Sequence, residues 1–170
     1  MKTPIIATLL LLTTASVGQD KDPTVVSICD LLRSPESFSG KMVRVSGDAM
    51  GPRALQVHDA DCGRISIAYT ENPDLKPKPR FKTVRDRNFH EFESNLGVLI
   101  PPPPERRTGL NCTPGRLTIT VDGRFDSSYA MRNGRRVQVS SGFGHMGLFE
   151  YRLVLLRVIA LDAKKPSCRR

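Results

Sequence analysis

The fold is indicated most directly by residues 116–125, which read RLTITVDGRF. Leu117, Ile119 and Val121 occupy every second position of this stretch, and polar residues lie between them. Successive side chains of a β-strand point to opposite faces of the sheet, so a period of two is typical of a strand with one buried face. We therefore predict a strand over 116–127.

Other segments show the same character. In KMVRVSG, residues 41–47, Val43 and Val45 share one face and polar residues share the other. YRLVLLRVIAL, residues 151–161, is apolar on both faces, which suits a strand covered on both sides, although periodicity alone does not exclude a helix. Asn133-Gly134 predicts an additional hairpin. The predicted strands lie near 42–49, 54–59, 64–70, 116–127 and 150–161.

Two helices are predicted between or before these strands. SICDLLRSPESF can begin a short helix at Ser27, and DRNFHEFESNLG offers Asp86 as an N-cap and Gly97 as its end. Residues 72–80 and 101–107 are rich in proline and are expected to be extended surface connectors.

The resulting order is a helix, three strands, a helix-bearing insertion at about 71–114, and two strands. This order matches a mainly β fold, the five-stranded Greek-key barrel of the OB type, in which a helix commonly lies between strands three and four. A small open sandwich or another five-stranded roll is the alternative.

Short motifs add a resemblance. CDLLRSPESFSGKMVRVSG, LQVHDADC and GFGHMG follow one another in the chain, and together they give the pattern CxLL, GKxVxVxG, DxC and GHxG. This pattern resembles a group of exported, uncharacterised bacterial OB-like proteins. The likeness covers roughly 28–68 and 142–160, leaves the insertion unmatched, and implies a fold but no activity.

The first residues predict export. Lys2 precedes a short apolar stretch from Ile5 to Leu12, and Ser16 and Gly18 place small residues before Gln19. These features predict a signal peptide over 1–18, followed by a single domain over 19–170. The apolar stretch is well below the ~20 residues that span a bilayer, so a retained membrane helix is the weaker interpretation. We expect a periplasmic or secreted protein.

The four cysteines, Cys29, Cys62, Cys112 and Cys168, predict two disulfides in an exported chain. In an OB topology, Cys29 and Cys62 belong at one end and Cys112 and Cys168 at the other, which favours the pairs 29–62 and 112–168. A 62–112 link at the base of the insertion is the competing pairing. No close CxxC pair is present, so we expect no metal site.

GFGHMG, residues 142–147, contains three glycines around His145. A phosphate-binding loop would be followed by a helix and a Lys-Ser/Thr signal, whereas the next segment reads as a strand. We expect the glycines to adopt positive φ angles or to permit close backbone approach. A ligand-contacting loop is the alternative, with His145, Phe143, Arg135 and Arg136 as its residues.

Neither the other histidines nor the basic charge points to a specific site. His58 lies beside Asp59 and Asp61, which we interpret as turn-forming residues and not as metal ligands. The chain has 26 Lys and Arg against 17 Asp and Glu, a net charge of +9, but only ten aromatic residues and no tryptophan. Because stacking aromatics accompany charge in single-strand binders, an anionic envelope component is favoured over nucleic acid as partner, and solubility alone is favoured over both as the role of the charge.

These observations predict a non-enzymatic, exported β module with an unknown ligand or partner and no cofactor. An exported nucleic-acid or polyanion binder is the first alternative. A hydrolase built on His145 with Ser140 or Ser141 is the second, although the chain has no GxSxG motif and no placed acid.

Overall fold

The computed structural model describes residues 22–51, 55–100, 111–113, 115–143 and 147–169. The predicted signal peptide at 1–18, the proline-rich residues 101–107 and His145 lie outside these residues. The fold is mainly β, with three helices and a short 3₁₀ helix among the described residues.

The main sheet contains the five strands that the sequence predicts, with one short addition. Their described bounds are β1 (Thr24–Val25), β2 (Met42–Met50), β3 (Gln56–Asp59), β4 (Gly63–Ala68), β6 (Arg116–Ser127) and β9 (Tyr151–Lys164). The segment at 151–161 is therefore a strand and not a helix. The two-residue β1 was not predicted.

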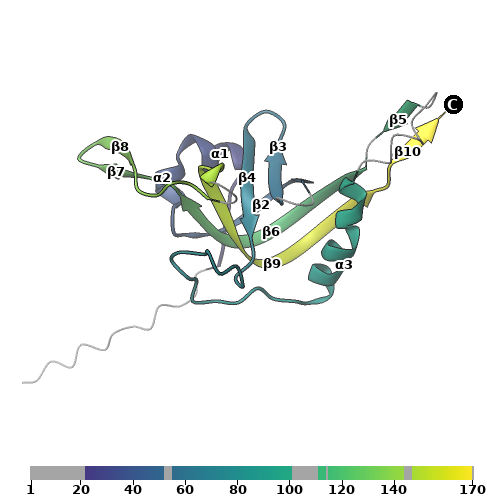
Figure 1. The fold of residues 1–170 in the computed structure, drawn as a ribbon, viewed down its shortest axis with the longest axis horizontal. Coiled ribbons are helices and arrows are strands. Elements are labelled where there is room, and N and C mark those ends of the chain that lie inside the picture. The colour runs from purple at the N-terminus through teal and green to yellow at the C-terminus, as the bar shows by residue number, and fades with distance from the viewer. Residues whose placement is uncertain (1–21, 52–54, 101–110, 114, 144–146, 170) are drawn as a thin grey trace, which may run out of the picture.

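The strand pairings form a closed circuit. β2 pairs with β3, β3 with β4, β4 with β9, β9 with β6, and β6 pairs back with β2. All these pairs are antiparallel except the parallel pair β4–β9, and β1 is a parallel neighbour of β2. Figure 1 shows β6 and β9 as the two long, curved strands that run side by side through the molecule.

Two small sheets extend from opposite ends of the molecule (Figure 1). One is the hairpin of β7 (Tyr129–Arg132) and β8 (Arg135–Gln138), and the other pairs β5 (Asn111–Thr113) with β10 (Ser167–Arg169). The hairpin confirms the prediction at Asn133-Gly134, where φ is 51° and 72°. Positive φ at both central residues is the requirement of the tight turns that join such strands.

The helices begin where the sequence places their caps. Ser27 accepts a hydrogen bond from the backbone N–H of Asp30 at the start of α1 (Ile28–Arg33), and Asp86 accepts one from Phe89 at the start of α3 (Arg87–Asn95). Proline is favoured in a first helical turn, and Pro35 begins a separate helix, α2 (Pro35–Phe38). The single N-terminal helix of the prediction is thus two. After α3, a 3₁₀ helix over Leu96–Leu99 carries the chain past Gly97, where the helix was expected to end.

The main core gathers side chains from the five longer strands and from α1 and α3. Val43 and Val45 of β2 and Leu117, Ile119 and Val121 of β6 are at most 1% exposed, as their alternation predicts. Phe89 and Phe92 of α3 complete this core, fully buried in the same cluster.

The outer face of β9 is covered by the insertion. Val154, which points away from the main core, packs with Ala68, Leu75 and Phe81 in a second small cluster. A hydrogen bond to the backbone of β9 fixes the cover, since the Thr83 hydroxyl donates to the Leu155 carbonyl at 2.9 Å. This covering explains why the strand is apolar on both faces.

One predicted disulfide is present: Cys29 and Cys62 are bonded, with their Cα atoms 5.0 Å apart. This bond excludes the 62–112 alternative. The backbone of β5 and β10 places Cys112 directly opposite Cys168. Directly opposite residues of antiparallel strands have Cα atoms ~4.5–5.5 Å apart, within the range of a disulfide.

Candidate ligand site

Polar side chains pair across the outward face of β2 and β6. Arg44 lies opposite Asp122 and donates two hydrogen bonds to its carboxylate, at 2.6 and 2.8 Å. Ser46 lies opposite Thr120, and their hydroxyl oxygens are 2.8 Å apart. The alternation that buries the valines of β2 therefore gathers the polar residues into cross-strand pairs.

Asp48 continues this row at the far end of β2. Its carboxylate accepts hydrogen bonds from Thr118 at 2.7 Å and from Arg116 at 2.8 Å. Burial alone would raise the pKa of Asp48, but the hydrogen bonds from Arg116 and Thr118 and the charge of Arg116 outweigh burial and lower that pKa. The same pairing raises the pKa of Arg116.

A cluster of three charged residues, Arg124, Asp126 and Arg152, lies where β6 ends and β9 begins. Asp126 accepts four hydrogen bonds, two from Arg124 at 2.8 and 2.9 Å and two from Arg152 at 2.7 and 3.3 Å. The side chain of Arg124 is only 14% exposed, that of Asp126 11% and that of Arg152 7%. Two cations share one anion, so the cluster carries an excess positive charge that is largely shielded from water.

The same guanidinium groups fasten the insertion to the sheet. Arg152 donates to the backbone carbonyl of Lys76 at 3.0 Å, and Arg124 donates to that of Pro77 at 2.9 Å. The side chain of Lys76 is exposed. The insertion therefore adds another cation to the edge of the cluster.

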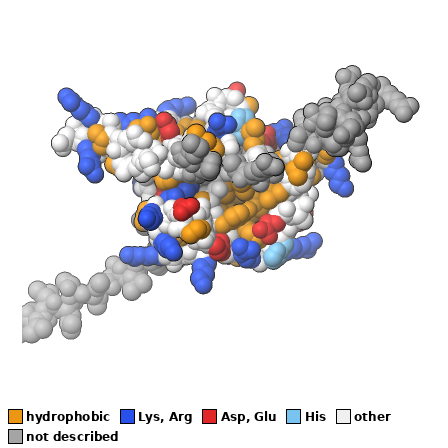
Figure 2. Space-filling model, in the orientation of Figure 1, with side chains coloured by type: hydrophobic (Ala, Val, Ile, Leu, Met, Phe, Trp, Pro, Cys, Tyr) orange, Lys and Arg blue, Asp and Glu red, His pale blue; other side chains and the backbone are white. Residues whose placement is uncertain are grey.

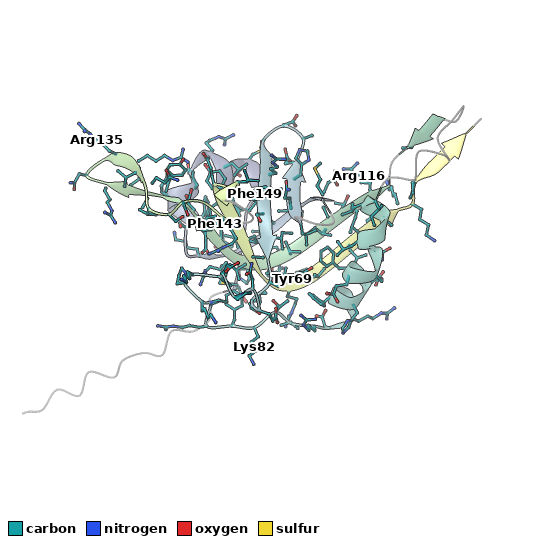
Figure 3. The ribbon with its side chains drawn as sticks, viewed as in Figure 1. Tyr69, Lys82, Arg116, Arg135, Phe143 and Phe149 are labelled. Atoms are coloured by element: carbon teal, nitrogen blue, oxygen red, sulfur yellow. A yellow bond between two sulfur atoms is a disulfide. The ribbon has the colours of Figure 1, made fainter. Side chains whose placement is uncertain are left out.

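Phe143 contributes an aromatic face on the other side of Arg152. The centre of the Arg152 guanidinium lies 4.2 Å from the centroid of the Phe143 ring, in cation–π contact. Figure 3 shows Phe143 beside the start of β9. Its backbone forms a bridge with Phe149, with N–H to carbonyl distances of 2.7 and 3.1 Å, so the loop between them is closed at its base.

These groups line an open pocket of about 550 Å³. Its charged lining residues are three cations and one anion, and its apolar lining consists of proline, valine and phenylalanine side chains. The lining residues are Ser39, Gly40, Lys76, Pro77, Arg124, Asp126, Ser127, Val139, Ser140, Phe143 and Arg152. Charge and apolar surface together suit a small anion that carries an apolar group.

The glycines of the GFGHMG stretch do what the sequence predicts at the two described positions. Gly142 and Gly147 have φ angles of 94° and 67°. A Cβ atom on Gly142 would come 2.3 Å from the carbonyl oxygen of Gly147, and one on Gly147 equally close to that of Ser141. Both positions combine a left-handed backbone with close approach of another chain segment. Gly144 and His145 lie outside the described residues.

The predicted site residues are not gathered at one place. Phe143 lines the pocket, whereas Arg135 lies near the tip of the β7–β8 hairpin, as Figure 3 shows. Arg136 binds within the protein: its guanidinium donates to the Tyr151 hydroxyl at 2.7 Å and lies 3.2 Å from a carboxylate oxygen of Glu36. Burial raises the pKa of Tyr151.

Sequence reasoning missed the Arg124–Asp126–Arg152 cluster. Part of the cluster is visible in the sequence, because Arg124 and Asp126 continue the polar face of the 116–127 strand. Arg152 is a second indication of a polar site, since it is a charged residue near the start of a mostly apolar strand. Their convergence depends on the register that sets Asp126 opposite Arg152.

Around His58 the structure agrees with the turn interpretation. One carboxylate oxygen of Asp59 accepts hydrogen bonds from the backbone N–H groups of Asp61 and Cys62, at 3.0 and 3.2 Å. Cys29, Asp59 and Cys62 bring their side-chain ligand atoms within 4.8 Å of one another. The two sulfur atoms are bonded to each other, so they are not thiolates available to a metal.

Comparisons with protein-family models, with curated proteins and with solved structures give no match. Among the described residues, none of the helices has the length and apolar character needed to cross a membrane.

Proposed function

We propose that the protein is an exported, non-enzymatic module with an OB-like barrel fold that binds a small anionic ligand at its Arg124–Arg152 pocket. The observation that carries the proposal is the excess of positive charge in that pocket, held on largely buried guanidinium groups. Burial strengthens the attraction of such groups for an anion, because less water screens them.

The barrel assignment rests on the circuit of pairings. The five longer strands are linked in the order β2–β3–β4–β9–β6 and back to β2, with β4 parallel to β9. α3 lies in the connection between the third and fourth of these strands. Both features are those expected of a five-stranded Greek-key barrel of the OB type.

Export is supported by the cysteines. A buried or half-buried disulfide such as Cys29–Cys62 persists in an oxidising compartment and is rare in the cytosol of ordinary bacteria. If the signal peptide is removed as proposed, N-terminal sequencing of the protein recovered from a bacterial periplasm or medium will begin at Gln19. A protein retained in the cytosol with residues 1–18 intact would refute export.

A binding role is favoured over catalysis because Asp126, the one carboxylate of the described pocket lining, is already engaged. The Asp126 carboxylate accepts hydrogen bonds from two arginines, which commits it to holding those side chains in place and leaves it a poor general base. Phe143, Pro77 and Val139 offer contact surface and no reactive group.

The test is calorimetric titration with inorganic phosphate and with phenyl phosphate. We expect saturable binding of both and tighter binding of phenyl phosphate, since its ring can contact the apolar lining. Lys76→Gln should weaken binding severalfold. Lys82→Gln, which removes an equal charge from an exposed residue outside the pocket lining, should leave binding unchanged.

Three results would contradict the proposal. The first is that neither probe binds saturably. The second is that the Lys76 and Lys82 variants lose equal amounts of affinity for the probes. The third is release of phenol or hydrolysis of a generic ester that disappears in His145→Ala, which would instead support the hydrolase.

A further inference from the structure

The hairpin of β7 and β8 projects from the body of the molecule (Figure 1). Arg136 lies opposite Met131, next to the tip, but its side chain reaches back to the base. There its guanidinium lies 4.1 Å from the centroid of the Tyr129 ring and contacts Glu36 and Tyr151. The hairpin is therefore fixed where it leaves the body, and its tip is presented to the surroundings.

Two arginines lie opposite each other at the tip. Arg132 and Arg135 are direct cross-strand partners on either side of Asn133-Gly134, and both are exposed. Among the described residues neither guanidinium has a hydrogen bond or an ion pair. Residues 127–141 contain no Asp or Glu, so the sequence places no counter-charge along the hairpin.

Such a pair weakens the hairpin by itself. Like charges directly opposite each other on a sheet repel and destabilise the strands that carry them. An anion that lies between the two guanidinium groups would remove this repulsion and accept hydrogen bonds from both. Figure 2 shows blue Lys and Arg side chains at this end of the molecule.

Apolar side chains accompany the charge. Met131, which precedes Arg132 and lies opposite Arg136, is 53% exposed. Val139, which follows β8 and also lines the pocket, is 47% exposed. The ring of Tyr129, the one aromatic residue of the two strands, is covered by Arg136. The hairpin thus offers cations and aliphatic surface but no free aromatic face on which a nucleic-acid base could stack.

We propose that the tip of the β7–β8 hairpin docks onto the surface of an anionic phospholipid bilayer. Arg132 and Arg135 bind lipid phosphate groups, and Met131 enters the boundary between headgroups and acyl chains. This inference uses none of the residues that carry the excess charge of the pocket, so it stands or falls independently of the proposed ligand.

The experiment is cosedimentation of the purified protein with vesicles of phosphatidylglycerol and phosphatidylcholine, and with phosphatidylcholine alone. We expect binding to the anionic vesicles only, and weaker binding at high salt because surface charges are screened. Each arginine at an anionic surface contributes about a fivefold change in partitioning, so Arg132→Gln/Arg135→Gln should reduce binding by about twenty-fivefold. Met131→Ser should also reduce it.

The matched control is Lys82→Gln/Arg87→Gln, which removes the same charge from exposed residues of the insertion and α3. It should reduce binding much less than the hairpin variant, and thermal melts should show that both variants fold. The inference is overturned if the two double variants lose binding equally, if neither loses binding, or if anionic vesicles do not bind the parent. It is also overturned if an oligonucleotide at equal charge concentration displaces the parent protein from the vesicles and binds the Arg132→Gln/Arg135→Gln variant more weakly than the parent.

Discussion

Asp126 of β6 and Arg152 of β9 face each other directly across the sheet, and a side-chain oxygen and nitrogen of the pair are 2.7 Å apart. Arg124, two residues before Asp126, donates hydrogen bonds to both oxygens of the same carboxylate. One buried carboxylate thereby holds two cations and, through their bonds to carbonyl groups of the insertion, the wall of the pocket.

Asp126→Asn should therefore be among the most destabilising single changes in the chain. It removes the only carboxylate of the Arg124–Asp126–Arg152 cluster and leaves two largely buried cations, and breaking buried ion pairs in this way costs ~3–5 kcal/mol. Urea unfolding of the purified protein measures the change. Asp30→Asn is the control, because its ion pair with Arg33 is exposed and should contribute less than ~1 kcal/mol. Equal losses in the two variants would show that Asp126 is not the centre of the cluster.

Gly142→Ala and Gly147→Ala should each destabilise the protein by ~1–3 kcal/mol. Each would place a Cβ atom against a backbone carbonyl at a positive φ angle. Gly97→Ala is the matched control, since Gly97 has no atom within 4 Å of the added Cβ and is not among the glycines with positive φ. Thermal melts of the three variants under oxidising conditions provide the comparison. Melting of all three alike would contradict the role assigned to the loop glycines.

Asp48→Asn should reduce the loss of unfolding free energy that the protein shows as the pH falls. The pKa of Asp48 is lowered in the folded protein, so its ionised form stabilises the fold above the unfolded-state pKa of ~3.9. That contribution disappears as pH falls through the lower, folded-state pKa. The difference in unfolding free energy between the parent and Asp48→Asn should be largest near neutral pH and should shrink at acid pH. A difference that grows on acidification would mean that the sign of the shift is wrong.

Peptide mapping without reduction should recover two linked pairs, Cys29 with Cys62 and Cys112 with Cys168. The first follows from the bond in the structure and the second from the opposite positions of the two residues on β5 and β10. Replacing Cys29 and Cys62 with serine should cost ~2–5 kcal/mol of stability. Free thiols at Cys112 and Cys168, or links between molecules, would contradict the second pair.

The strands were predictable because their signal is local. The alternation of residues over 116–127 and the apolar run at 151–161 can each be seen within the segment itself, and each pattern predicts which side chains of the strand are buried. β1, with two residues, and β5 and β10, with three each, are too short to show any period. The division between α1 and α2 depends on Pro35, which begins the second helix, whereas the sequence pattern predicts a single helix.

The pocket was not predictable because its members come from separate parts of the chain. Arg124 and Arg152 converge only through the β6–β9 register, and Lys76 reaches them only because the insertion folds back over β9. Arg136 illustrates the same difficulty, since its partner Glu36 is one hundred residues away in sequence. Local patterns identify which side chains are polar, but not which of them meet.

The pairing of β2 with β6 has a consequence for how the chain reaches its fold. Val45 and Val121, which are partners in this pair, are separated by about half of the domain, so their contact closes a long loop. Contacts of this kind slow folding, because the entropy of the loop is lost before the contact is gained. β2, β3 and β4 can pair with one another as soon as they are synthesised, whereas closure of the circuit must wait for β9, the last of its five strands to leave the ribosome.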